Sequence, residues 1–107
     1  VLTMSRSDLD AGDLRKMGDF LKDRNPDCVA VLAAIQGDKI TLLAVCGKNA
    51  IARGIKAGDL IRKVSAICGG SGGGKPDSAM GGGKDILKLD DALATVDDFV
   101  NETVKPL

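Results

Sequence analysis

The sequence predicts a small α/β domain, in which a mixed β-sheet packs in two layers against about three α-helices. Two nearly continuous apolar runs, at residues 28–35 and 40–46, are typical of central strands. Three apolar patterns at helical spacing lie before and after these runs. The 107 residues are 44% apolar and 28% charged, as expected for one globular domain that spans residues 1–107.

The first elements are expected to be a strand and a helix. Residues 1–4 are typical of the end of a strand, and a start inside an element suggests a piece of a longer protein. Asp10 should cap the helix, with Asp13 three residues later, because both carboxylates lie near the positive end of the helix dipole. Residues 25–26, Asn-Pro, end the helix. Its apolar side chains at helical spacing are Leu14, Met17, Phe20 and Leu21.

The two apolar runs are predicted to form a hairpin, because the four residues between them include a glycine and an aspartate. Residues 47–49 close this hairpin. Neither run alternates polar with apolar side chains, so both faces of the hairpin should be covered by helices.

Two more helices are predicted, at residues 57–68 and from residue 89 to residue 104. Gly69 ends the first of them, as glycines often do at helix C-termini, and Arg62 and Lys63 point outward. The expected buried positions are Leu60, Ile61, Val64 and Ile67 in one helix, and Leu89, Leu93, Val96, Val100 and Val104 in the other. The solvent face of the last helix is acidic, with Asp90, Asp91, Asp97, Asp98 and Glu102.

The composition excludes several kinds of chemistry. The chain has no His, Trp or Tyr, so it lacks the most frequent general base and the most frequent zinc ligand. Phe20 and Phe99 are its only aromatic residues, and both belong to helical apolar stripes. Stacking of bases on exposed rings is therefore not expected to be the main mode of any nucleic-acid contact.

The three cysteines, Cys28, Cys46 and Cys68, lie far apart in apolar segments and form no CxxC pair. We interpret them as small buried hydrophobic residues in a reducing compartment, and a redox or metal-binding thiol remains the alternative. No apolar run is long enough to cross a membrane and no leader pattern is present, so we expect a cytoplasmic protein.

Charge is unevenly distributed along the chain, although the net charge is zero. Residues 1–38 carry five basic and seven acidic side chains, and residues 85–107 carry two basic and six acidic ones. Residues 39–84 carry eight basic side chains against two acidic ones, a local charge of plus six. This middle third indicates an anionic partner, or else only a set of solvated helix faces.

Residues 69–84 hold eight of the fourteen glycines and are predicted to form a loop. Such a segment is either a flexible linker, a tight packing corner beside the sheet, or a backbone surface that accepts an anion or a nucleotide. Lys75 and Lys84 lie at the two ends of the segment, and their positive charge would favour an anion or a nucleotide on such a backbone surface.

Gly69, Gly74 and Lys75 also match the GxxxxGK spacing of a phosphate-binding loop, so a nucleotide hydrolase has to be considered. Pro76 stands where that motif needs a Ser or Thr hydroxyl for magnesium. The segment also follows a helix, whereas the motif follows a strand, which argues against this class of enzyme.

Four stretches carry a resemblance to a known family: residues 57–60 (AGDL), 69–77 (GGSGGGKPD), 79–82 (AMGG) and 10–19 (DAGDLRKMGD). They resemble the C-terminal domain of alanyl-tRNA synthetases, called C-Ala and of the DHHA1 type. With the last helix, the resemblance covers essentially the whole chain. The same domain type is similar to the accessory domain of DHH-family phosphoesterases, in which a separate domain carries out catalysis.

The resemblance implies a non-catalytic domain of a longer ligase that attaches alanine to tRNA(Ala) using ATP. Such a domain contacts the elbow of the L-shaped tRNA and helps to join aminoacylation with editing. Its implied partners are tRNA and the other domains of the synthetase, and a homodimer is also open. No cofactor is implied in this domain; ATP, Mg and Zn belong to other domains of the ligase.

The implied RNA contacts are the glycine segment and its flanking lysines, to which we add two basic residues of the middle third. They are Gly69, Gly70, Gly72, Gly73, Gly74, Lys75, Gly81, Gly82, Gly83 and Lys84, with Lys48 and Arg53 as the additions. Ser71 departs from the family, in which Lys or Arg is frequent at this position. Two alternatives remain: an accessory domain of a DHH-type phosphoesterase, and a structural or dimerisation module whose interface is the acidic last helix with apolar patches.

Overall fold

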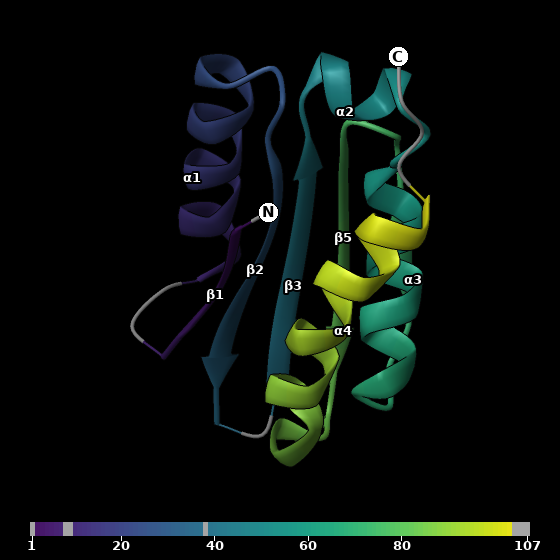
Figure 1. Ribbon diagram of the computed structural model, residues 1–107. Coiled ribbons are helices and arrows are strands. Elements are labelled where there is room, and N and C mark those ends of the chain that lie inside the picture. The colour runs from purple at the N-terminus through teal and green to yellow at the C-terminus, as the bar shows by residue number, and fades with distance from the viewer. Residues whose placement is uncertain (1, 8–9, 38, 104–107) are drawn as a thin grey trace.

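The computed structural model describes residues 2–7, 10–37 and 39–103. Five strands form one mixed sheet in the order β1-β2-β3-β5-β4 (Figure 1). β1 runs parallel to β2, and every other neighbouring pair in this sheet is antiparallel. The strands are β1 (Leu2–Arg6), β2 (Val29–Gln36), β3 (Lys39–Cys46), β4 (Gly72–Gly74) and β5 (Ser78–Gly83).

Helices cover both faces of this sheet. α1 lies on one face, and α3 and α4 lie on the other (Figure 1). The predicted α/β class with a mixed sheet is confirmed, but the layers number three rather than two, because α1 packs on the face opposite to α3 and α4. The helices are α1 (Ala11–Arg24), α2 (Lys48–Ala52), α3 (Ala57–Ile67) and α4 (Leu89–Thr103), with a 3-10 turn at Ile86–Lys88.

The start of α1 is fixed by the expected cap. The Asp13 amide donates to the Asp10 carboxylate at 2.9 Å, and the Asp10 amide donates to the Asp13 carboxylate at 3.2 Å. This reciprocal pair satisfies two amides that a helix start otherwise leaves unpaired. At the other end, the Asn25 amide donates to the Leu21 carbonyl at 3.0 Å, so both predicted helix ends are confirmed.

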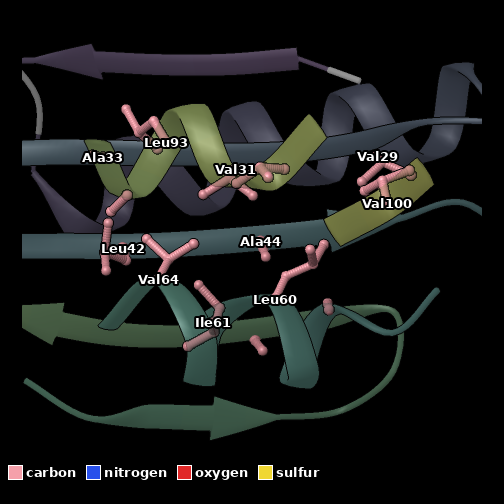
Figure 2. Close-up of a cluster of buried hydrophobic side chains, with 14 of the residues drawn as sticks. Val29, Val31, Ala33, Leu42, Ala44, Leu60, Ile61, Val64, Leu93 and Val100 are labelled. Atoms are coloured by element: carbon pink, nitrogen blue, oxygen red, sulfur yellow. The ribbon is translucent and has the colours of Figure 1, made fainter. Parts of the chain in front are cut away.

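Alternate residues of β2 and β3 supply two separate cores. On the α1 side, Leu32 and Leu43 pack with Leu14. On the other side, Val31 and Leu42 face residues of α3 and α4, and Figure 2 shows this larger cluster between the sheet and the two helices. The uninterrupted apolar runs of the sequence therefore correspond to strands buried on both faces. Val104, which the sequence analysis placed on the last helix, lies outside the described residues.

All three cysteines are free and buried, as expected from the sequence. Burial raises the pKa of the Cys46 thiol to about 12, with further contributions from Cys28 and Asp77. Burial also raises the pKa of Cys28 and that of Cys68. A raised pKa keeps these groups as uncharged thiols, which is the state of a small core residue rather than of a reactive one.

The prediction that residues 69–84 form a loop is wrong. β4 and β5 form an antiparallel hairpin, and β5 pairs with β3 from Ser78 to Gly83. Because both strands belong to the sheet, the flexible-linker interpretation is excluded.

Gly47 closes the β2–β3 hairpin as predicted, since its amide donates to the Cys28 carbonyl at 2.8 Å, and Lys48 then begins the short helix α2. Over the described part of the chain, no helix combines the length and apolarity that a membrane crossing requires.

Candidate nucleic-acid interface

Most of the glycines in and beside the β4–β5 hairpin are needed where the strands lie directly against α3 or against each other. A Cβ atom at Gly81 would overlap Ser65 Oγ, and one at Gly83 would overlap Cys68 Cβ. A Cβ atom at Gly70 would overlap the carbonyl oxygen of Gly82. The tight packing corner is therefore present, and these glycines have a structural reason that requires no ligand.

The same reason applies to two glycines of β4. A Cβ atom at Gly72 would overlap Gly81 Cα and lie 2.6 Å from Ile61 Cγ2. One at Gly74 would lie 2.8 Å from Ala79 Cα. Both distances are too short for carbon atoms, so side chains at these positions would push β4 away from β5 or from α3.

Two glycines of the candidate set, Gly69 and Gly73, have room for a Cβ atom, and Gly82 has a single close neighbour. Gly69 has a φ of +75° after α3, and a Cβ atom there would have no neighbour within 4 Å, so this glycine is needed for its backbone conformation. A Cβ atom at Gly73 would meet Arg62 Nε at 3.7 Å, which is an ordinary contact. One at Gly82 would meet only the Ile40 carbonyl oxygen, at 3.0 Å.

Gly73 and Gly82 lie on one side of the hairpin, which we call the open face. In the register of the sheet, Gly82 pairs with Thr41, and Met80 pairs with both Leu43 and Gly73. Residues that pair across antiparallel strands share a face, and Leu43 belongs to the α1 side of the sheet. Among the described residues of β4 and β5, only Met80 packs against the core on the α1 side, and it is partly buried.

The open face is bordered by the side of α1. Arg15 Nε of α1 lies 3.1 Å from Met80 Sδ of β5, and the Arg15 side chain is exposed. Sequence reasoning missed both residues. Their meeting depends on β5 joining the sheet next to β3, and nothing in the glycine segment indicated that pairing.

Lys75 and Lys84 are exposed but do not lie together. Lys75 is in the turn between β4 and β5, where its amide donates to the Ser78 carbonyl at 3.0 Å, and Lys84 follows the other end of β5. The five residue steps from Ser78 to Gly83 correspond to about 16 Å of strand. Gly83 pairs with Ile40, so Lys39 adjoins Lys84 at that end. The open face therefore has exposed lysines at both ends.

Lys48 and Arg53 are placed by α2 at the end of the molecule that holds the β4–β5 turn. Lys48 lines a hollow of about 420 Å³ together with Lys22, Asp23 and Asp77, so the charges around the hollow balance. Lys22 is already paired with Asp77 at 3.3 Å. Arg53 is exposed at the C-terminal cap of α2 and does not line this hollow.

A second hollow, of about 240 Å³, lies where α3 begins beside the hairpin. Its lining includes Lys56, Arg62 and Gly74, and the Ala57 amide donates to the Pro76 carbonyl at 2.8 Å. Asp59 accepts from Arg62 at 3.3 Å. Lys56 and Arg62 belong to the basic middle third of the sequence but are not among the contacts predicted from it, because only the fold brings them beside the β4–β5 turn.

The residues that match a phosphate-binding loop do not form one. Gly69 ends α3 and Gly74 ends β4, so the segment leads from a helix into a strand rather than from a strand into a helix. Within the described residues, no group of three or more His, Cys, Asp or Glu side chains could hold a metal ion.

Comparisons with known proteins give the family. Residues 1–102 match the DHHA1 domain. The chain is 43% identical over 96 residues to the alanine–tRNA ligase of Bacillus cytotoxicus, and this match covers 90% of the chain. It is also 43% identical over 95 residues to the alanine–tRNA ligase of Bacillus subtilis, with 89% of the chain covered. The chain spans 11% of the length of each of these two proteins.

The fold is similar to the crystal structure of the C-Ala domain from Aquifex aeolicus alanyl-tRNA synthetase. The TM-score is 0.84 at 30% sequence identity, with 92% of this chain and 89% of that chain covered. Sequence and structure thus agree with the resemblance carried by the glycine segment. The chain belongs to the DHHA1 domain family and matches the C-Ala domain of alanyl-tRNA synthetase.

Proposed function

We propose that the chain is the non-catalytic tRNA-binding domain of an alanine–tRNA ligase, and that it contacts the tRNA elbow. The ligase that contains it attaches alanine to tRNA(Ala) in the cytoplasm. The domain helps to join aminoacylation with editing, while ATP, Mg and Zn are used in other domains. The relatives that share its sequence are alanine–tRNA ligases, which supports this assignment.

The observation that carries the proposal is the open face with lysines at both ends. An elbow exposes the flat side of a tertiary base pair between two phosphate backbones. Gly73 and Gly82 leave backbone without side chains on the open face, so a flat surface can approach closely. Lys75 at one end, and Lys39 with Lys84 at the other, supply attraction to phosphates on either side.

Five glycines of the candidate set contribute to this surface indirectly. Three of them allow α3 to lie against the hairpin and the other two allow neighbouring chain segments to lie close together, so their main chain is not all available to a ligand. These glycines are Gly70, Gly72, Gly74, Gly81 and Gly83. Lys48 lies near the β4–β5 turn, in a hollow whose charges balance, and Arg53 does not line that hollow, so neither residue carries the proposal.

The test measures binding of the purified chain to tRNA(Ala) over a series of salt concentrations. Lys75→Ala combined with Lys84→Ala should weaken binding and lower the salt slope by about two, since each lost phosphate contact lowers it by roughly one. A minihelix without the elbow should bind much more weakly than whole tRNA. Equal affinity for minihelix and tRNA, or an unchanged salt slope in the double variant, would count against the proposal.

A second role is favoured by a separate observation on the far side of α1. Phe20 is 56% exposed there, and a shallow groove of about 500 Å³ is lined by Met4, Met17 and Leu21 as well. Such a groove is suited to contact with another domain of the ligase or with a second copy of the chain. Sedimentation at several protein concentrations distinguishes a self-associating chain, whose apparent mass rises with concentration, from a monomer.

A further inference from the structure

We propose that Arg15 and Met80 form the stacking contact of the open face and determine its preference for a flat, exposed base pair of folded RNA. This inference rests on the proposed tRNA-binding function. The two side chains come from different layers of the molecule, α1 and β5, and meet at 3.1 Å between Arg15 Nε and Met80 Sδ. They place a planar guanidinium and a polarizable thioether side by side on a face where Gly73 and Gly82 carry no side chains.

The aromatic residues cannot supply this contact. Phe20 lines the apolar groove on the other side of α1, and Arg24 lies 4.5 Å from the centroid of its ring. Phe99 packs against the core on the α3 side of the sheet, with Lys63 at 4.7 Å from its ring centroid. Neither ring lies on the open face, so a base that stacks there must use a different planar group.

An arginine side chain is suited to that purpose. Its guanidinium is planar and weakly hydrated, and guanidinium planes stack on nucleobases in RNA complexes. The thioether of Met80 holds the guanidinium at one edge and adds polarizable surface at the level of the strand backbone. Arg15 is exposed while it makes this contact, so it remains available to a ligand.

Charge on the open face favours RNA as the occupant. In β3, side chains alternate between faces, so Lys39 shares the face of Leu43; Lys75 is exposed in the turn that follows β4. Arg15 adds a third positive charge beside Met80, while the acidic Asp19 of α1 lies 4.0 Å from Lys22. Asp77, at the turn, is paired with Lys22 at 3.3 Å. Its negative charge is therefore balanced by Lys22 and does not reduce the positive charge of the other basic residues.

The experiment separates stacking from charge with Arg15→Lys, which retains the positive charge and loses the plane. We expect this variant to bind tRNA(Ala) about ten-fold more weakly, with an unchanged salt slope, since stacking on one base is worth roughly that factor. Met80→Ala should show a similar loss, also without a change in salt slope. The double variant Lys75→Ala with Lys84→Ala, by contrast, should lower the salt slope of tRNA binding.

Two further variants complete the design. Lys16→Ala removes a charge from the same helix on the side of the apolar groove, and it should bind within about two-fold of the original chain. Gly73→Val places a side chain on the open face, where the one neighbour of a Cβ atom is the flexible Arg62 side chain at 3.7 Å, so it should fold and bind weakly. Circular dichroism and thermal unfolding check the fold of each variant.

The outcomes distinguish the two proposals. If the original chain does not bind tRNA, the proposed function fails. If the original chain binds and Arg15→Lys binds equally well, the stacking role is overturned while the tRNA-binding function stands. Arg15 is exposed, so this variant decides the question even if Met80→Ala fails to fold. Loss of binding by Lys16→Ala to the same degree as Arg15→Lys would also contradict a specific stacking contact.

Discussion

At the scale of single residues, glycines that look alike in the sequence have different tasks. Gly70 has no room for a side chain, because a Cβ atom there would overlap the carbonyl oxygen of Gly82. At Gly73, three residues later, a Cβ atom would lie 3.7 Å from Nε of the flexible Arg62 side chain, which is an ordinary contact. The division between supporting and surface glycines depends on the distance to α3 and to the neighbouring strand.

The matched pair Gly70→Ala and Gly73→Ala tests this division. Gly70→Ala should lower the free energy of unfolding by about 1–3 kcal/mol, because the clash is with backbone that must move. Gly73→Ala should change it by less than about 1 kcal/mol, since it fits the space and restricts the unfolded chain. Urea unfolding measures both, and an equal loss in the two variants would show that the division is wrong.

Sequence reasoning could not make this division. It identified the glycine segment as important, but eight glycines in sixteen residues give no alternation of side chains from which a strand or a face can be read. It also could not find Arg15 and Met80, which are 65 positions apart. Lys75 and Lys84 were both found from the sequence, whereas their separation along β5 required the structure.

At the scale of elements, the predictions were best where side chains signal the structure. The ends of α1 followed from Asp10, Asp13 and the Asn-Pro pair, and β2 and β3 followed from their apolar runs. β4 and β5 were missed because they are held by the backbone pairing of β3 and by contact with α3, rather than by their own side chains. Propensity disfavours glycine in strands, and tertiary packing overrides it here.

The cap of α1 gives a prediction at this scale. Asp10→Ala should reduce the free energy of unfolding by about 1 kcal/mol, because the Asp13 amide loses its acceptor at 2.9 Å. Asp13→Ala removes the weaker half of the pair, at 3.2 Å, and should cost less. Chemical denaturation of both variants provides the measurement. A larger loss in Asp13→Ala than in Asp10→Ala would contradict the assignment of the cap.

At the scale of the whole molecule, three layers bury all three thiols, and this links stability to alkaline pH. The folded pKa of Cys46 is raised to about 12 from an ordinary value of 9.0, chiefly by burial. The unfolded chain therefore releases this proton first as pH rises. The stabilising contribution of the buried thiol is complete below pH 9 and is lost as pH rises from 9 toward 12.

Stability should fall in that window by up to about 1.4 kcal/mol per pH unit for this thiol. Cys46→Ala should make the decline shallower, although the variant begins from a lower stability because it leaves a small cavity. Denaturation midpoints measured between about pH 7 and pH 11 test the slope. An identical slope in the original chain and in Cys46→Ala would mean that the thiol does not account for the decline.

The contact between α3 and the glycine hairpin also connects the interior of the domain to its outer surface. Ser65, Ile61 and Cys68 touch the hairpin from the side that faces away from solvent, so the thickness of these three side chains determines how β4 and β5 lie. A larger residue at Ser65 would tilt the strands and reshape a surface that it never reaches. If the open face binds RNA as proposed, substitutions at these three buried positions of α3 should change RNA affinity without touching the RNA themselves.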